Sequence, residues 1–209
     1  MRSVSDTLLF GAGGKKAGPP ISFIGSATAE SPTQTAVAPT HQIGDLLVVI
    51  SSVAFSRSFP DLSGFSTLFS FNTRFDVPSF EGTVKVQYRS AASTSYTVPA
   101  WGATAFGADQ ATILVYRAPL IGASSATTSG GSTYPALTFN NANNTSWGLR
   151  IFGRGAADGF NTPAPTFTMR RQQYFCVISD SNSTLSSLSA DSVGGVPAYV
   201  NAASIELKV

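Results

Sequence analysis

The chain has 209 residues, which suits one large all-β domain or two small ones. Only 11% of the residues are charged and the formal net charge is +2, with no run of Lys or Arg longer than two, which argues against nucleic-acid binding. The single cysteine, Cys176, excludes an internal disulfide and a cysteine-rich zinc site. Such a weakly charged surface is typical of a subunit held permanently in an assembly, or of a protein that works outside the cell.

Residues 1–20 differ in composition from the rest of the chain. An apolar triplet is followed by a Gly-rich stretch with two lysines that ends in Pro19-Pro20, and this predicts an extended arm. No apolar run here is long enough for a signal peptide, so we expect synthesis in a cytoplasm without export. We expect the arm to anchor the chain on a partner through buried apolar side chains and through lysines that meet acidic groups: Leu8, Leu9, Phe10, Lys15 and Lys16.

From residue 21 onward, β-branched and aromatic runs bounded by Gly, Pro, Asn and Ser predict strands. The continuous apolar run from Leu46 to Ile50 is typical of a central strand that is covered on both faces. The alternation of Val84 and Val86 with Lys85 and Gln87 predicts a strand with one wet face. No helix is expected beyond one turn within 183–191. The expected strands are 21–25, 34–39, 45–53, 66–71, 83–89, 94–98, 111–117, 134–139, 147–153, 165–169, 173–179 and 198–208.

The second half of the chain repeats the order of segments found in the first half. The anchor pairs are Ile24 with Ile121, Asp45 with Trp147, and Ile113 with Ile205, at offsets of 97, 102 and 92 residues. We therefore predict an all-β fold: a jelly-roll-like antiparallel β-sandwich built from two similar halves and preceded by the arm. The pseudo-repeats are 21–118 and 119–209, and we expect them to share one core.

Few residues offer catalytic chemistry. His41 is the only histidine, it lies in a polar connection, and no nucleophile elbow accompanies it, so a Ser-His-Asp triad and a histidine-based metal site are not favoured. Most of the eleven acidic residues flank turns, although a pair of carboxylates needs only to be close in space to hydrolyse a glycoside. We expect no enzymatic activity, no cofactor and no metal.

Aromatic side chains in loop-like segments allow two interpretations of their role. Trp101, Phe106 and Phe160 lie in Gly- or Pro-rich segments, where exposed rings could stack on the sugars of a glycan. The favoured reading is that they plug the ends of the sandwich or are buried against a neighbouring subunit, because many exposed aromatics on a monomer promote aggregation.

Several segments in order carry a resemblance to a known class of proteins. They are Ile21-Ser22-Phe23-Ile24-Gly25-Ser26-Ala27, Gly44-Asp45-Leu46-Leu47-Val48-Val49, Gly64-Phe65-Ser66-Thr67-Leu68, Val86-Gln87-Tyr88-Arg89-Ser90-Ala91 and Ile113-Leu114-Val115-Tyr116-Arg117-Ala118. This order resembles small virion structural proteins of tailed bacteriophages. The resemblance covers roughly 21–209, is clearest in the first half and includes no catalytic motif. It implies a particle-attached β-sandwich that acts by binding.

The expected function is that of a non-enzymatic bacteriophage virion structural protein. The arm would attach it to the particle, where it would act as a surface decoration or cement protein or as a tail-associated subunit. The expected partners are capsid or tail subunits and further copies of the chain, with no nucleic acid and no membrane. Two alternatives stay open: a glycan-binding adhesin for the host surface, and a glycan hydrolase, which would need two carboxylates about 5–10 Å apart.

Overall fold

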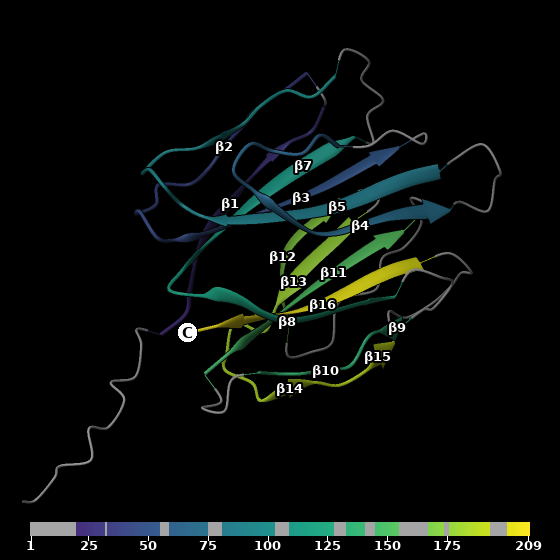
Figure 1. The fold of residues 1–209 in the computed structure, drawn as a ribbon. Helices are drawn as coiled ribbons and strands as arrows, with labels where there is room; N and C mark the ends of the chain where they lie inside the picture. Colours follow the sequence, from purple (N-terminus) through teal and green to yellow (C-terminus); the bar gives the residue numbers. More distant parts are fainter. Residues whose placement is uncertain are drawn as a thin grey trace, which may run out of the picture.

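The computed structural model describes residues 20–31, 33–54, 59–74, 81–102, 109–127, 133–140, 145–154, 167–173, 176–192 and 200–209. Every regular element in these ranges is a β-strand, and all the strand pairs are antiparallel (Figure 1). The predicted all-β sandwich of two halves is therefore confirmed. The predicted arm falls on residues 1–19, outside the described residues, and on Pro20.

Five strands of the first half form one sheet, the N-half sheet, in the order β1-β7-β3-β5-β4. Their bounds are β1 (Ser22–Ala29), β3 (Leu46–Ala54), β4 (Ser66–Arg74), β5 (Glu81–Ser90) and β7 (Gln110–Arg117). Five strands of the second half form the C-half sheet in the order β12-β13-β11-β16-β8. Their bounds are β8 (Leu120–Thr127), β11 (Trp147–Arg154), β12 (Thr168–Gln173), β13 (Cys176–Asp180) and β16 (Val200–Lys208).

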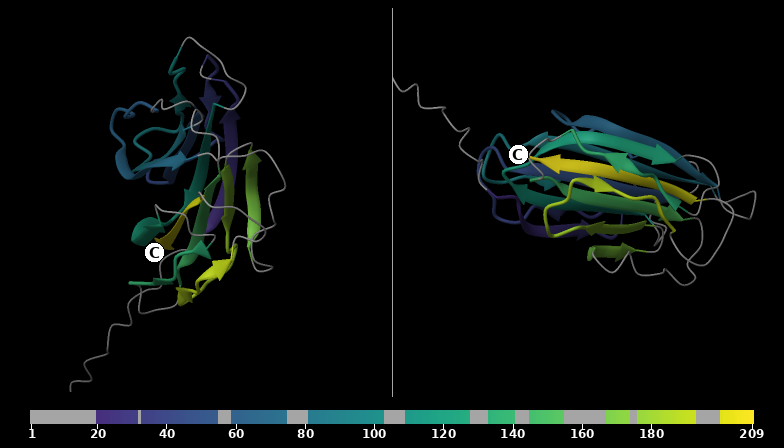
Figure 2. Two further views of the ribbon diagram at one scale, coloured as in Figure 1. Left: turned by 90° about the vertical axis from the view of Figure 1, so that its right-hand side faces the viewer. Right: turned by 90° about the horizontal axis from the view of Figure 1, so that it is seen from below.

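Short two-stranded ribbons add an outer layer on each side of the sandwich. Over the N-half sheet, β2 (Ala36–Val37) pairs with β6 (Thr97–Val98). Over the C-half sheet, β9 (Thr133–Tyr134) pairs with β15 (Asp191–Ser192), and β10 (Leu137–Thr138) pairs with β14 (Ser187–Leu188). Figures 1 and 2 show the two large sheets face to face between these outer layers.

The main core lies between the two sheets and takes side chains from both halves. Val48 and Leu114 point inward and meet Leu149 and Ile205 of the C-half sheet. Alternate residues such as Leu47 point outward, where the outer ribbon and the loops bury them in a second cluster. This explains the continuous apolar run at 46–50, because both faces of β3 are covered. This central cluster contains side chains from both halves of the chain.

The prediction that one face of β5 is exposed to water is wrong. Lys85 and Gln87 are buried, at 9% and 1% exposure, beneath residues 59–62. The Lys85 Nζ donates a hydrogen bond to the Phe59 carbonyl (3.0 Å), and the Gln87 amide donates to the Pro60 carbonyl (3.0 Å) and accepts from the Leu62 N–H (2.9 Å). The polar residues are therefore on the expected face, but they hold down a covering loop instead of facing water.

The two sheets have equivalent strand orders and registers. Val48 pairs with Leu114 in the N-half sheet as Leu149 pairs with Ile205 in the C-half sheet, so the offsets are 149 − 48 = 101 and 205 − 114 = 91 residues. The bulges match as well, since the extra residue of β4 is Leu68 and that of β12 is Arg170 (170 − 68 = 102). The duplication inferred from sequence thus appears in the topology.

The residue pairs matched between the two halves from sequence are nevertheless each one residue out of register with the structural equivalence. Ile113 was matched to Ile205, yet Ile113 packs in the outer cluster and Ile205 packs in the central core. The residue equivalent to Ile205 is Leu114. Because successive side chains of a strand point to opposite faces, a shift of one residue exchanges the inner and outer sets.

Candidate functional site

Most of the site residues predicted from sequence lie outside the described residues. The predicted anchoring residues, Leu8, Leu9, Phe10, Lys15 and Lys16, are among them, as are Phe106 and Phe160. Trp101 is the predicted contact residue that the structure does describe.

Trp101 is a half-buried side chain on the outer side of the N-half sheet. Its ring packs edge-to-face on the buried ring of Phe59, with centroids 4.9 Å apart, and joins the outer cluster. Its indole nitrogen is buried, and no described residue accepts a hydrogen bond from it. The Trp101 ring is therefore packed within the chain, against the outer cluster of the N-half sheet.

His41 is buried, at 3% exposure, in the connection that precedes β3. Its Nδ1–H donates a hydrogen bond to the Pro39 carbonyl at 2.7 Å. In the described part of the chain, no hydroxyl or carboxylate bonds to its Nε2. The side chain therefore shapes the loop, and the arrangement around it is not that of a catalytic base aligned with a nucleophile.

A buried polar network connects the two sheets near one end of the sandwich. The Tyr116 hydroxyl, on β7, donates to the Asp180 carboxylate, on β13, at 2.8 Å. Arg170 binds the same carboxylate through Nε (2.6 Å) and Nη2 (2.8 Å), and the Asn182 N–H donates to it at 3.0 Å. Asp180 has no solvent exposure, so these four hydrogen bonds replace the water that its charge would otherwise require. We call Tyr116, Arg170 and Asp180 the clasp.

Phe23 on β1 extends the clasp. Its ring lies 4.0 Å from the guanidinium carbon of Arg170 and 5.3 Å from the ring centroid of Tyr116. The duplicated fold gives a direct comparison, because the positions equivalent to Phe23 and Arg170 are Ile121 and Leu68, and both pack against the central core. One end of the sandwich is thus joined through charged groups at positions where the pseudo-symmetric end has uncharged residues, since the position equivalent to Asp180 is Tyr88.

Glu206 on β16 is a second fully buried carboxylate. Its Oε2 accepts hydrogen bonds from the Ala123 N–H (2.8 Å) and the Asn140 N–H (2.9 Å), and its Oε1 accepts one from the Ser146 hydroxyl (2.7 Å). It joins β8, β16 and the segment that follows β10. A Cβ on Gly122 would lie 2.3 Å from Glu206 Oε2, so glycine is required there for the carboxylate to fit.

Arg150 on β11 is a buried cation in the outer layer of the C-half sheet, with 1% exposure. It pairs with Asp191 and donates to the Ser189 carbonyl at 2.6 Å. Its guanidinium carbon lies 4.9 Å from the Tyr134 ring centroid and 4.6 Å from that of Phe167. The charge therefore fixes the outer ribbons onto the sheet.

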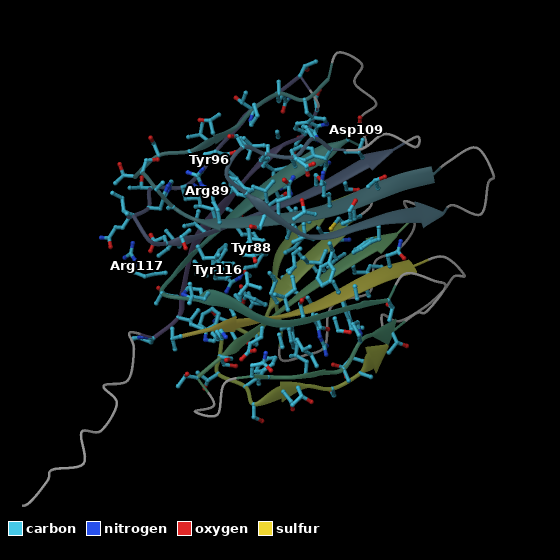
Figure 3. All side chains as sticks on the ribbon, viewed as in Figure 1. Tyr88, Arg89, Tyr96, Asp109, Tyr116 and Arg117 are labelled. Carbon is cyan, nitrogen blue, oxygen red and sulfur yellow. The ribbon has the colours of Figure 1, made fainter. Side chains whose placement is uncertain are left out.

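Arg89 on β5 has a different environment. Its guanidinium carbon lies 5.1 Å from the Phe65 ring centroid and 5.0 Å from that of Tyr96, and those two centroids are 5.1 Å apart. Figure 3 shows Arg89 beside Tyr96 on the outer side of the N-half sheet, whereas Tyr116 lies between the sheets. Arg89 and Tyr96 are half-buried.

Two buried tyrosines and the buried cysteine have pKa values raised by their surroundings. Burial, followed by the nearby Asp180 charge, raises the pKa of Tyr116 well above its usual range. Burial also raises the pKa of Tyr134, and it raises the pKa of the Cys176 thiol to about 12. All three groups are therefore neutral at physiological pH, and the thiol is shielded from reaction as a nucleophile.

Sequence reasoning did not identify the clasp, the Glu206 site or the Arg89 cluster. Arg170, Asp180 and Glu206 were visible as charges within or beside apolar strand patterns, which is the available signal for a buried polar group. Their partners lie in distant segments, for example 64 residues apart for Tyr116 and Asp180, and no local pattern reveals them.

The described residues contain no group of three His, Cys, Asp or Glu side chains that could hold a metal ion. The same part of the chain contains no helix long and apolar enough to cross a membrane. Comparison with protein-family models, with curated proteins and with solved structures gives no match.

Proposed function

We propose that the chain is a non-enzymatic structural protein of a bacteriophage virion. Residues 1–20 attach it to the particle, and the β-sandwich acts as a surface decoration or cement protein or as a tail-associated subunit. Its partners are capsid or tail subunits and further copies of itself. The proposal starts from the resemblance of residues 21–209 to virion proteins and from the low charge of the chain.

The observation that carries the proposal is the character of two edge strands. β1 (Ser22–Ala29) and β8 (Leu120–Thr127) end their sheets and contain no charged residue and no proline. Free-standing proteins protect such edges with charge, proline or bulges. Here each strand has one bulge near its start, which leaves 25–29 and 124–127 in regular register. Edges of this kind suit contact with neighbouring subunits.

The environment of the acidic residues also supports a structural role. Asp45, Asp180, Asp191 and Glu206 each accept hydrogen bonds or ion pairs from side chains or backbone groups that connect separate segments. A carboxylate occupied in this way holds the fold together and is not arranged to act on a substrate.

The direct test is the protein content of purified particles. Phage carrying the intact gene and phage encoding a chain without residues 1–20 are purified by density gradient and analysed by quantitative mass spectrometry. We expect the full chain in particles at a fixed copy number, and the truncated chain folded in the lysate but absent from particles. Absence of the full chain would overturn the virion role, and incorporation of the truncated chain would overturn the role of the arm.

A further inference from the structure

Arg89 is an exception among the arginines whose side chains the structure describes. Arg117, Arg150, Arg170 and Arg171 each pair with a carboxylate. No described residue accepts a hydrogen bond from Arg89, and its contacts are with the rings of Phe65 and Tyr96. In a fold that pairs its other described arginines, this one has a fixed position and no carboxylate partner among the described residues.

Two loops hold the Arg89 guanidinium in place. Phe65 follows the turn at Gly64 and Tyr96 precedes β6, and their rings form a triangle with the guanidinium whose sides are all close to 5 Å. Gly64 has φ +76°, and a Cβ there would lie 3.3 Å from Arg89 Nη1, so glycine lets the turn approach the cation. Cation–π contact orients the planar group without using its N–H donors.

The donors that remain define what the site can bind. Arg89 Nε is buried and has no partner in the described part of the chain, so the terminal nitrogens of this half-buried side chain are the accessible donors. A guanidinium held in one orientation presents two parallel N–H groups, which match the two oxygens of a carboxylate. The donors therefore fit an anion of planar, bidentate geometry.

The rim of the site indicates the rest of the ligand. The two loops, 62–66 and 91–96, present exposed hydroxyls at Ser63, Ser93 and Ser95 and no large exposed apolar side chain. The centre of a protein–protein interface is usually apolar, whereas a rim of hydroxyls suits a polyhydroxylated ligand. We propose that Arg89, Phe65 and Tyr96 form a binding site for the carboxylate of an acidic saccharide, such as a uronic acid unit.

This inference goes beyond the proposed attachment role and does not depend on it. Saccharide binding is a property of the isolated protein, whereas attachment is measured on particles. Either result can therefore fail while the other stands. The site is also separate from Trp101, whose ring packs on Phe59.

The test is titration of the purified full-length chain with trigalacturonate, trimannuronate and sialyllactose, with binding measured by calorimetry or ligand-observed NMR. We expect one of the three to bind, and its neutral methyl ester to bind at least tenfold more weakly. Arg89→Ala is expected to weaken binding at least tenfold, and Arg89→Lys several-fold, because an ammonium cannot form the planar pair. The matched control is Lys208→Gln, which removes one positive charge away from any described ion pair and should change affinity less than twofold.

Four outcomes would overturn the proposal. They are failure of the wild-type chain to bind any of the three saccharides, binding that survives Arg89→Ala, equal affinity for the methyl ester, and competition by acetate as strong as that of the saccharide itself. Far-ultraviolet circular dichroism and thermal unfolding of Arg89→Lys, the more conservative variant, show whether a loss of binding reflects the site and not the fold.

Discussion

The hydroxyl of Tyr116 donates a hydrogen bond of 2.8 Å to the carboxylate of Asp180, and this contact crosses from the first half of the chain to the second. Both side chains have no solvent exposure. Arg170 neutralises the carboxylate and lies over the ring of Phe23, so residues of β1, β7, β12 and β13 meet at one point. The relative position of the two sheets is specified here by direction-dependent polar contacts as well as by apolar packing.

Breaking the clasp should destabilise the protein strongly. Asp180→Ala leaves the Arg170 cation without its partner, and we expect the free energy of unfolding to fall by about 3–5 kcal/mol. Tyr116→Phe removes one neutral donor and should cost about 1–2 kcal/mol. Urea denaturation measures both effects.

The duplicated fold supplies the control for the clasp. The positions equivalent to Arg170 and Asp180 are Leu68 and Tyr88, which are both uncharged, so the double variant Arg170→Leu with Asp180→Leu removes a charged pair that the other end lacks. It should be more stable than Asp180→Ala, because no buried charge is left unpaired. A cost below about 1 kcal/mol for Asp180→Ala alone would contradict this account of the network.

Gly122 should not tolerate a methyl group. Its Cβ would lie 2.3 Å from Glu206 Oε2, and three hydrogen bonds prevent that carboxylate from moving aside. We expect Gly122→Ala to lower the free energy of unfolding by about 1–3 kcal/mol. In a Glu206→Ala background the same change should cost less than about 0.5 kcal/mol, and a cost that stays the same in both backgrounds would rule out the clash as its cause.

Stability should fall at alkaline pH because buried acids must lose their protons. The pKa of Cys176 is raised from 9.0 to about 12 in the folded chain, so its contribution is complete below pH 9 and is lost as the pH rises from 9 towards 12. Between pH 8 and pH 10 the wild type should lose about 1 kcal/mol more than Cys176→Ala does.

The measurement is urea denaturation of both chains at the two pH values. Tyr116 and Tyr134 titrate in the same direction in both chains, so the difference between the slopes isolates the thiol. A thiol reagent at pH 8 should label Cys176 only on unfolding, and rapid labelling of the folded chain would contradict the burial of the thiol.

Residues 20–118 should not form a stable domain alone. Without the C-half sheet, the inner face of the N-half sheet, including Val48, Val86 and Leu114, would be exposed to water. Each such side chain loses about 1.5–3 kcal/mol of burial free energy. We expect the fragment to aggregate or to give a poorly dispersed NMR spectrum, whereas the full chain unfolds cooperatively. A monomeric fragment with a dispersed spectrum would show that the outer cluster alone is sufficient for folding.

Local patterns in the sequence were sufficient to predict the strand content and the duplication, because both depend on the order of neighbouring residues. β-branched runs, turn residues and the continuous apolar stretch at Leu46 to Ile50 are read from neighbours in the chain, and these signals led to the two-half sandwich. The order of segments also showed that the halves correspond, although only to within one residue at each anchor.

The tertiary structure alone decided which face each residue occupies and which charges meet. A shift of one residue reverses the faces of a strand, so Ile113 and Leu114 could not be assigned from pattern alone. The burial of Lys85 depends on a loop that covers it, and the charge of Asp180 is stabilised by Tyr116 and Arg170, which lie 64 and 10 positions away in the chain. Buried charge is stabilised by partners that only the folded chain brings within hydrogen-bond distance. That no described residue supplies such a partner to Arg89 could likewise be recognised only in the folded chain.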